Sequence, residues 1–129
     1  MPPWSLLADA LLVLHGLFVV WVVAGAFAVA RRPLLAALHL PALAWGAWIE
    51  FSGGICPLTP LENAWRARAG EAGYAGGFIE HYLGAALYPA GLTREHQAWL
   101  GGAVLAINLV LYARLVFRLR SRHQEAPRP

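Results

Sequence analysis

An uncharged run of 21 residues from Ala10 to Ala30 constrains this chain more than any other feature. At about 1.5 Å of rise per residue, a helix of this length crosses a hydrocarbon layer of roughly 30 Å. A cleaved signal peptide is the competing interpretation, because Ala28, Val29 and Ala30 resemble a cleavage site. We expect an uncleaved span over about residues 8–30, because no basic residue precedes the run and its length exceeds a usual signal-peptide core.

Two further apolar runs predict two more membrane spans, over about residues 33–51 and 97–117. The first of them begins at Pro33, directly after Arg31 and Arg32, and proline suits the first turn of a helix. The composition agrees with this interpretation, since 59% of the 129 residues are hydrophobic and only 13% are charged. The sequence therefore predicts an all-α membrane protein folded as a compact helical bundle.

The insert over residues 52–92 decides how many spans the bundle has. Residues 59–62, Thr-Pro-Leu-Glu, have the pattern of a capping box and predict the start of a short amphipathic helix. A second short helix is expected over about residues 78–87, and its length of about 15 Å suits a re-entrant or interfacial helix. A fourth span over residues 74–92 is the alternative. In either case residues 1–117 form a single transmembrane domain.

The positions of the basic residues predict how the chain is oriented. All ten basic residues are arginines; most of them bracket the apolar runs, and five lie at or beyond the end of the last run. This pattern is typical of the cytoplasmic segments of an inner-membrane protein, and it argues against a nucleic-acid-binding face. We expect the amino terminus outside and residues 118–129 as a basic, disordered cytoplasmic tail. The expected partners are the lipid bilayer and other membrane subunits or a second copy of the chain.

Several polar side chains are expected to meet at the outer membrane edge. By helical rise, His15 and Glu50 lie about 24 Å and about 27 Å from the arginine hinge, so they share one level. The insert brings Cys56, Glu80 and His81 to the same edge. Imidazole, carboxylate and thiolate groups are ligands of zinc, copper and iron. These five residues therefore predict a transition-metal, haem or redox-cofactor site, although no H-x-x-x-H or C-x-x-C pair supports it.

The alternative for the same groups is a structural polar network, in which His15 and Glu50 form a buried hydrogen-bonded pair. At a deeper level, we expect His39 to bond to Asn108 across helices, and Glu62 to act as the capping carboxylate. The protein would then be a non-catalytic accessory or assembly subunit of a larger membrane complex. No nucleophile motif occurs, so the sequence assigns no enzymatic activity.

Two short runs carry a family resemblance. They are Cys-Pro-Leu-Thr-Pro-Leu-Glu-Asn at residues 56–63 and Phe-Ile-Glu-His-Tyr at residues 78–82. Together with His39-Leu40-Pro41, they resemble the bacterial domain-of-unknown-function family 2784, over about residues 8–112. The resemblance implies a small bacterial integral membrane protein, and it implies no established activity.

Overall fold

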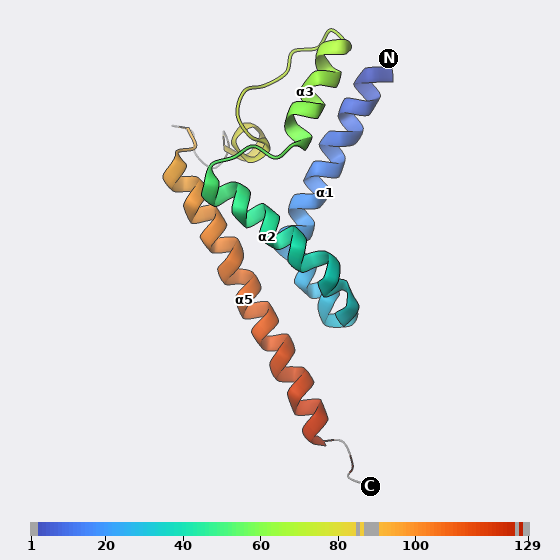
Figure 1. The fold of residues 1–129 in the computed structure, drawn as a ribbon, viewed down its shortest axis with the longest axis vertical. Helices are drawn as coiled ribbons and strands as arrows, with labels where there is room; N and C mark the ends of the chain where they lie inside the picture. The colour runs from blue at the N-terminus through green and yellow to red at the C-terminus, as the bar shows by residue number, and fades with distance from the viewer. Residues whose placement is uncertain (1–2, 85, 87–90, 126, 128–129) are drawn as a thin grey trace.

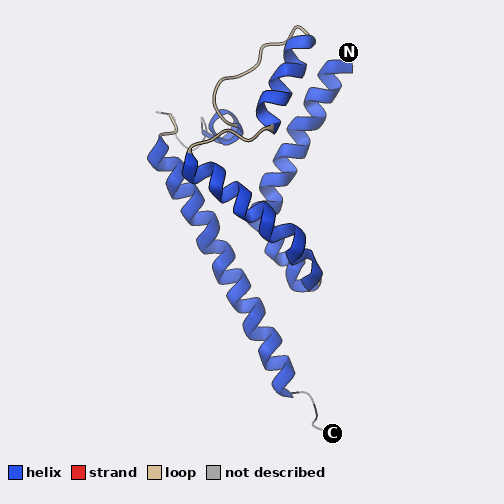
Figure 2. Ribbon diagram, viewed as in Figure 1, coloured by secondary structure: helices blue, strands red, loops and turns tan. Residues whose placement is uncertain are grey.

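The computed structural model describes residues 3–84, 86, 91–125 and 127. Over these residues the regular structure is entirely helical (Figure 2), which confirms the expected fold class. In chain order the elements are α1 (Pro3–Arg31), the 3₁₀ helix η1 (Pro33–Leu35), α2 (Ala36–Ser52), α3 (Leu58–Arg68), the π-helix η2 (Glu80–Gly84) and α5 (Arg94–Glu125).

Three of the described helices are long and apolar enough to cross a membrane. They are α1, the continuous helical segment Pro33–Ser52 and α5. The segment Pro33–Ser52 begins as the sequence predicts, with Arg32 as the N-cap and Pro33 in the first turn. Three apolar helices of this length indicate a membrane protein.

The three long helices form the bundle, and α3 packs along the N-terminal half of α1 (Figure 1). The chain reverses at η1, so α2 runs back against α1, and α5 contacts both. In the same view η2 is seen end-on, so its axis lies across the bundle. This orientation agrees with an interfacial or re-entrant helix; its expected end at residue 87 lies outside the described residues. The part of the chain that the structure describes contains no fourth helix of membrane-spanning length.

Small residues allow the long helices to approach closely. A side chain at Gly25 would collide with the ring of His39. A Cβ at Gly46 would lie 3.1 Å from Val22, and one at Gly101 would lie 3.2 Å from Glu50. The glycine-containing faces therefore pack within the chain itself.

His39 and Asn108 meet at the inner level, but the expected direct hydrogen bond between them is wrong. His39 Nδ1 is hydrogen-bonded to the hydroxyl of Tyr112 at 2.7 Å, and His39 Nε2 lies 3.3 Å from the carbonyl oxygen of Val22. The Asn108 amide donates to the same carbonyl oxygen at 3.2 Å. The Val22 carbonyl oxygen has two lone pairs and accepts from both side chains, which therefore bond to it rather than to each other.

The C-terminal end of α2 is fixed by a glycine turn and by an arginine. Gly53 has a φ of 65°, and the N–H of Gly54 donates to the carbonyl of Ile49 at 3.1 Å, which closes the helix as a Schellman turn. The guanidinium of Arg94 donates to two carbonyl oxygens in the last turn of α2. The start of α5 is thereby joined to the end of α2.

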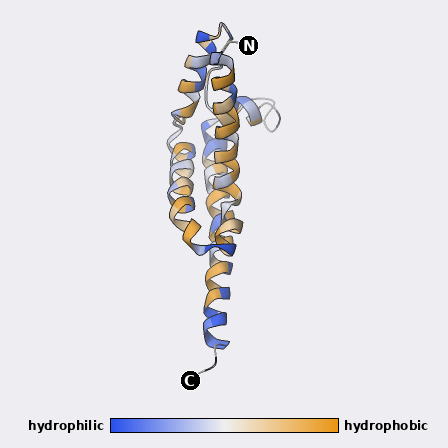
Figure 3. Ribbon diagram, turned by 90° about the vertical axis from the view of Figure 1, so that its right-hand side faces the viewer, coloured by the Kyte–Doolittle hydropathy of each residue, from blue (hydrophilic) through white to orange (hydrophobic). Residues whose placement is uncertain are grey.

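The C-terminal end of α5 differs from the expected disordered tail. The helix continues to Glu125, so residues 118–125 are helical. This segment contains no glycine or proline, and its arginines, Leu119, Gln124 and Glu125 are strong helix formers. Figure 3 shows the hydrophilic end of α5 extending beyond the hydrophobic bundle.

Candidate functional site

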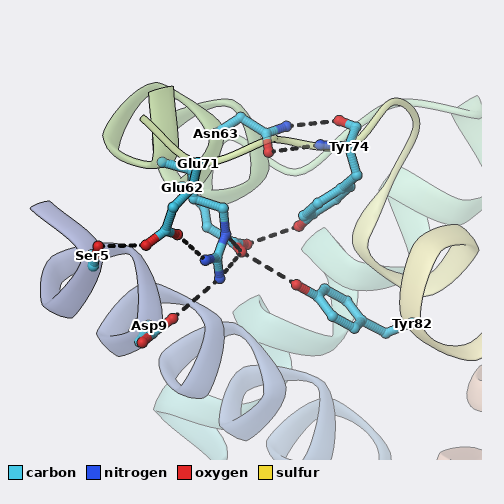
Figure 4. A network of polar contacts seen from close by, with 8 residues as sticks. Ser5, Asp9, Glu62, Asn63, Glu71, Tyr74 and Tyr82 are labelled. Carbon is cyan, nitrogen blue, oxygen red and sulfur yellow. Dashed lines mark hydrogen bonds and ion pairs between the residues drawn. The ribbon is translucent and has the colours of Figure 1, made fainter. Parts of the chain in front are cut away.

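Eight polar residues meet where α3 packs on α1, and we call them the Glu62 cluster (Figure 4). They come from α1, α3, the loop after α3 and η2. The members are Ser5, Asp9, Glu62, Asn63, Arg66, Glu71, Tyr74 and Tyr82. At the centre lies the side chain of Glu62, which is fully buried.

The carboxylate of Glu62 accepts hydrogen bonds from three side chains. Arg66 Nε donates to Oε1 at 2.9 Å, and the hydroxyl of Tyr74 donates to Oε2 at 2.8 Å. The hydroxyl of Tyr82 donates to Oε1 at 3.4 Å. Since a buried charge is tolerated only when it is paired and hydrogen-bonded, these donors explain how Glu62 is accommodated.

The expected capping box is therefore wrong. The helix α3 begins at Leu58 with Pro57 as its N-cap, and no side chain caps its N-terminus. Glu62 lies four residues before Arg66, and this spacing places the two side chains on one helix face. The Glu62 carboxylate therefore bonds to the Arg66 guanidinium and to two tyrosine hydroxyls rather than to the helix N-terminus.

Arg66 joins α3 to α1 and to the following loop. Its guanidinium donates to Asp9 Oδ1 at 3.3 Å and to Glu71 Oε2 at 3.0 Å, and Ser5 donates to the other oxygen of Glu71. Burial opposes the positive charge of Arg66, but hydrogen bonds to Glu62 and Glu71 outweigh it and raise the pKa of the guanidinium. The hydrogen bond from Ser5, with the pairing to Arg66, lowers the pKa of the Glu71 carboxyl.

The loop after α3 is fixed by Asn63 and by aromatic contacts. The Asn63 side chain exchanges two hydrogen bonds with the backbone of Tyr74, at 2.9 Å and 3.2 Å. Burial raises the pKa of the Tyr74 and Tyr82 phenols, and the negative charge of Glu62 raises it further. Both phenols therefore stay protonated and act as donors at neutral pH.

His81 and His15 pack differently from each other. The ring of His81 stacks on Tyr74 with centroids 4.0 Å apart, so this histidine lies beside the Glu62 cluster. The ring of His15 stacks on Phe78 with centroids 4.2 Å apart. These contacts position η2 and the residues before it against α1.

Four of the five predicted ligand residues line one small cavity, which we call the outer cavity. They are His15, Glu50, Cys56 and Glu80, and the cavity has a volume of about 40 Å³. The space is large enough for a water molecule or one small polar group. Cys56 is a free thiol of intermediate exposure.

The expected hydrogen bond between His15 and Glu50 is absent. His15 Nδ1 and Glu50 Oε2 are both buried, and neither has a hydrogen-bond partner. His15 is positioned by its ring contact with Phe78 rather than by a carboxylate. Two residues that line the outer cavity, His15 and Glu50, therefore each contain a buried polar atom without a hydrogen-bond partner.

A larger, apolar cavity adjoins the outer cavity and lies between α1, α2, α5 and η2. Its volume is about 170 Å³, close to the roughly 150 Å³ of an engineered cavity that binds benzene. Glu50 and Ile79 line both cavities. The other described residues that line the apolar cavity are Phe18, Val19, Val22, Val23, Gly46, Ala47, Leu83, Leu100, Gly101 and Val104.

No three or more histidine, cysteine, aspartate or glutamate side chains among residues 3–84, 86, 91–125 and 127 are arranged to hold a metal ion. The metal or haem site on His15, Glu50, Cys56, Glu80 and His81 therefore stays a prediction. The structure brings four of these residues to one cavity and packs the fifth on Tyr74.

The sequence interpretation missed most of the Glu62 cluster. The four-residue spacing of Glu62 and Arg66 was an available signal, because it is typical of a helical ion pair. No signal links Arg66 to Asp9, which lies 57 positions earlier in the chain. That contact depends on the docking of α3 on α1.

The fold and these two regions define a small, all-helical membrane protein that has, at one end of its bundle, a paired polar cluster beside a ligand-sized cavity. The chain belongs to the family described as "Protein of Unknown function (DUF2784)", whose family model matches residues 5–113. This match confirms the resemblance found in the sequence. Neither the curated proteins nor the solved structures include a match to this chain.

Proposed function

We propose that this protein is a polytopic inner-membrane protein that binds a lipid-soluble amphiphile with a ring-sized apolar body. The ring would lie in the apolar cavity, and a hydrogen-bonding head would reach the outer cavity. Quinones and quinols are the chemical class that fits this description best. The proposal includes the membrane orientation expected from the arginines. The amino terminus lies outside, and the arginine-rich end of α5 lies in the cytoplasm.

The observation that carries the proposal is a pair of buried side-chain atoms without hydrogen-bond partners, one on His15, which lines the outer cavity, and one on Glu50, which lines both cavities. An unsatisfied buried polar group costs about 1–3 kcal/mol, so His15 Nδ1 and Glu50 Oε2 are unfavourable without a partner. A quinol hydroxyl donates to a carboxylate, and an imidazole nitrogen donates or accepts according to its tautomer. A ligand head with both capacities would satisfy the two atoms together.

The shape of the site supports the same class of ligand. The apolar cavity is walled on one side by Ile79 and Leu83, which lie in or next to η2. Tyr82 of η2 donates to Glu62, and Phe78 stacks on His15. The Glu62 cluster thus has a definite role, since it positions the wall that closes the ligand cavity.

The proposal is tested by filling the apolar cavity. Wild-type protein in mild detergent is titrated with a benzoquinone that carries a decyl chain, and bound probe is measured by native mass spectrometry. We expect one probe per chain in the wild type, and at least a tenfold weaker complex in Val104→Phe, because the phenyl ring would occupy the cavity. Val110→Phe is the control, since Val110 is on the same helix and 52% exposed. Equal binding by the two variants would contradict the proposal.

The metal or haem hypothesis is kept as a second proposal, because four candidate ligands line the outer cavity. Elemental analysis and an absorption spectrum of the protein, purified without chelator, test it. Near-stoichiometric metal or a Soret band that is lost in His15→Ala would support it. A folded, colourless and metal-free protein would exclude a tightly bound metal or haem.

The accessory-subunit hypothesis is tested by a membrane partner that co-purifies with the chain. The helix faces that contain Gly25 and Gly46 are not free to dock a partner, since these glycines pack against His39 and Val22 of the same chain. Bulky substitutions there would perturb the bundle itself. The hypothesis therefore needs a partner surface elsewhere on the helices.

A further inference from the structure

A second hollow lies at the opposite end of the bundle, between the C-terminal part of α1 and α5. Its volume is about 150 Å³. Small and apolar residues form one part of its surface, and three arginines form the rest. We call it the arginine groove, and its lining residues are Ala26, Phe27, Ala30, Leu111, Arg114, Leu115, Arg118, Leu119 and Arg122.

The arginines of the groove follow one helix face. Arg114, Arg118 and Arg122 are four residues apart along α5, and this spacing makes them neighbours on an α-helix. Arg118 also lines an adjoining hollow that includes Arg31 at the end of α1. Four guanidinium groups from two helices therefore surround one region of the surface, and all four residues are exposed.

No carboxylate neutralises these charges within the described part of the chain, where every ion pair involves Arg66. Like charges at four-residue spacing repel each other, so the arrangement becomes favourable when an anion lies among them. Arginines at the outer end differ in this respect. Arg94 donates to the end of α2, and Arg68 lies over the ring of Trp4 at 4.8 Å.

The groove lies where an apolar helix segment ends. Residues 97–113 of α5 contain no charged side chain, and they span about 25 Å before Arg114. Lipid headgroups are expected at such a boundary, and basic pockets between helices bind anionic headgroups. Guanidinium groups form bidentate hydrogen bonds to phosphate, which makes arginine suited to this ligand.

We propose that the arginine groove binds the phosphate of an anionic phospholipid. In this site Arg114, Arg118 and Arg122 would contact the headgroup, and an acyl chain would lie along Phe27 and Leu111. The groove is separate from the apolar cavity, because the two share no lining residue. The inference therefore stands or fails independently of the proposed quinone site.

The test compares two lipids with the same acyl chains. The full chain in mild detergent is titrated with dimyristoyl phosphatidylglycerol or dimyristoyl phosphatidylcholine, and bound lipid is counted by native mass spectrometry. We expect wild-type protein to prefer phosphatidylglycerol. Arg118→Gln should weaken this complex on the order of fivefold, and the triple Arg114, Arg118 and Arg122 to Gln variant should weaken it on the order of a hundredfold.

Arg120→Gln is the matched control, since it makes the same charge change on the same helix outside the groove. It should stay within about twofold of wild type if the groove, rather than total charge, determines binding. Equal losses in Arg118→Gln and Arg120→Gln would overturn the proposal, and so would equal binding of the two lipids. Complete displacement by excess inorganic phosphate would make the groove a free-phosphate site and would also overturn it. Circular dichroism verifies that all variants keep their helicity.

Discussion

Two neighbouring regions at one end of the bundle each contain a glutamate, and they differ in how its buried carboxylate oxygen atoms are hydrogen-bonded. In the Glu62 cluster, the buried carboxylate of Glu62 accepts hydrogen bonds from an arginine and two tyrosines. In the outer cavity, Glu50 Oε2 and His15 Nδ1 are buried and have no partner. Under our proposal, this difference separates groups that stabilise the fold from groups that bond to a ligand.

The short segment around η2 connects the two regions. Tyr82 is bonded to the Glu62 cluster, while Phe78 and Ile79 line the outer cavity and Ile79 and Leu83 line the apolar one. The hydrogen-bonded Glu62 cluster therefore holds in place the segment that forms one wall of the two cavities. Substitutions in the two regions should have effects of opposite sign on stability.

The largest effect is expected from Glu62→Ala. Removing this carboxylate leaves Arg66 and two phenols without their shared partner, and breaking a buried pair costs about 3–5 kcal/mol. Thermal or chemical unfolding in detergent measures the loss. Glu95→Ala, at an exposed position of α5, should change stability by no more than about 0.5 kcal/mol. A small effect of Glu62→Ala would mean that the cluster does not stabilise the docking of α3.

Glu50→Leu should have the opposite sign. Glu50 is half-buried and its Oε2 atom is buried without a partner, so an apolar side chain of similar volume should raise the free energy of unfolding by about 1–2 kcal/mol in ligand-free protein. The same unfolding experiment measures it. Destabilisation comparable to that of Glu62→Ala would show that Glu50 has a structural partner.

Substitutions of the two tyrosines measure how much each hydrogen bond to Glu62 contributes to stability. Tyr74→Phe and Tyr82→Phe each remove one hydrogen bond to Glu62, which should cost about 0.5–1.5 kcal/mol. The larger cost is expected for Tyr74, because its bond is 2.8 Å long and that of Tyr82 is 3.4 Å long. The reverse order would indicate that the ring of Tyr82, rather than its hydroxyl, determines the contact.

The pH dependence should follow the shifted groups of the cluster and be the smallest effect. The raised pKa of Tyr74 and Tyr82 gives stability that is complete below the ordinary tyrosine pKa of about 10 and is lost as pH rises above it. The lowered pKa of Glu71 gives stability that is present above the ordinary glutamate pKa of about 4.3 and is lost as pH falls below it.

Both directions of the pH dependence are checked by melting temperatures measured from about pH 3 to about pH 11, a range that includes both ordinary pKa values. The double variant Tyr74→Phe, Tyr82→Phe should lose less stability than wild type at the alkaline end. An unchanged alkaline slope in this variant would assign the loss to other groups.

The membrane-spanning part of the fold could be predicted from the sequence because a hydrophobic run is a local property. The uncharged segment Ala10 to Ala30 and Pro33 after two arginines were sufficient for the first two helices. The charged residues after Phe117 predict the end of the last helix, whereas α5 continues to Glu125 because the helix propensity of these residues is high.

The site was harder to predict, because its contacts depend on how separate segments dock. Helical rise brought His15 and Glu50 to one level, and both line the outer cavity. The same argument could not show that the ring of Phe78 would stack on His15, or that the ring of Tyr74 would stack on His81. Glu62 was assigned to a cap because local spacing favoured it, whereas Arg66 and the tyrosines determined its position.

The most direct test of the ligand site is the melting temperature of wild-type and Glu50→Leu protein with and without the decyl benzoquinone. We predict that the probe raises the melting temperature of the wild type, because it supplies partners to His15 and Glu50. Glu50→Leu should melt higher than wild type without the probe and respond little to it. A variant that melts lower than wild type, yet gains as much from the probe, would contradict the account.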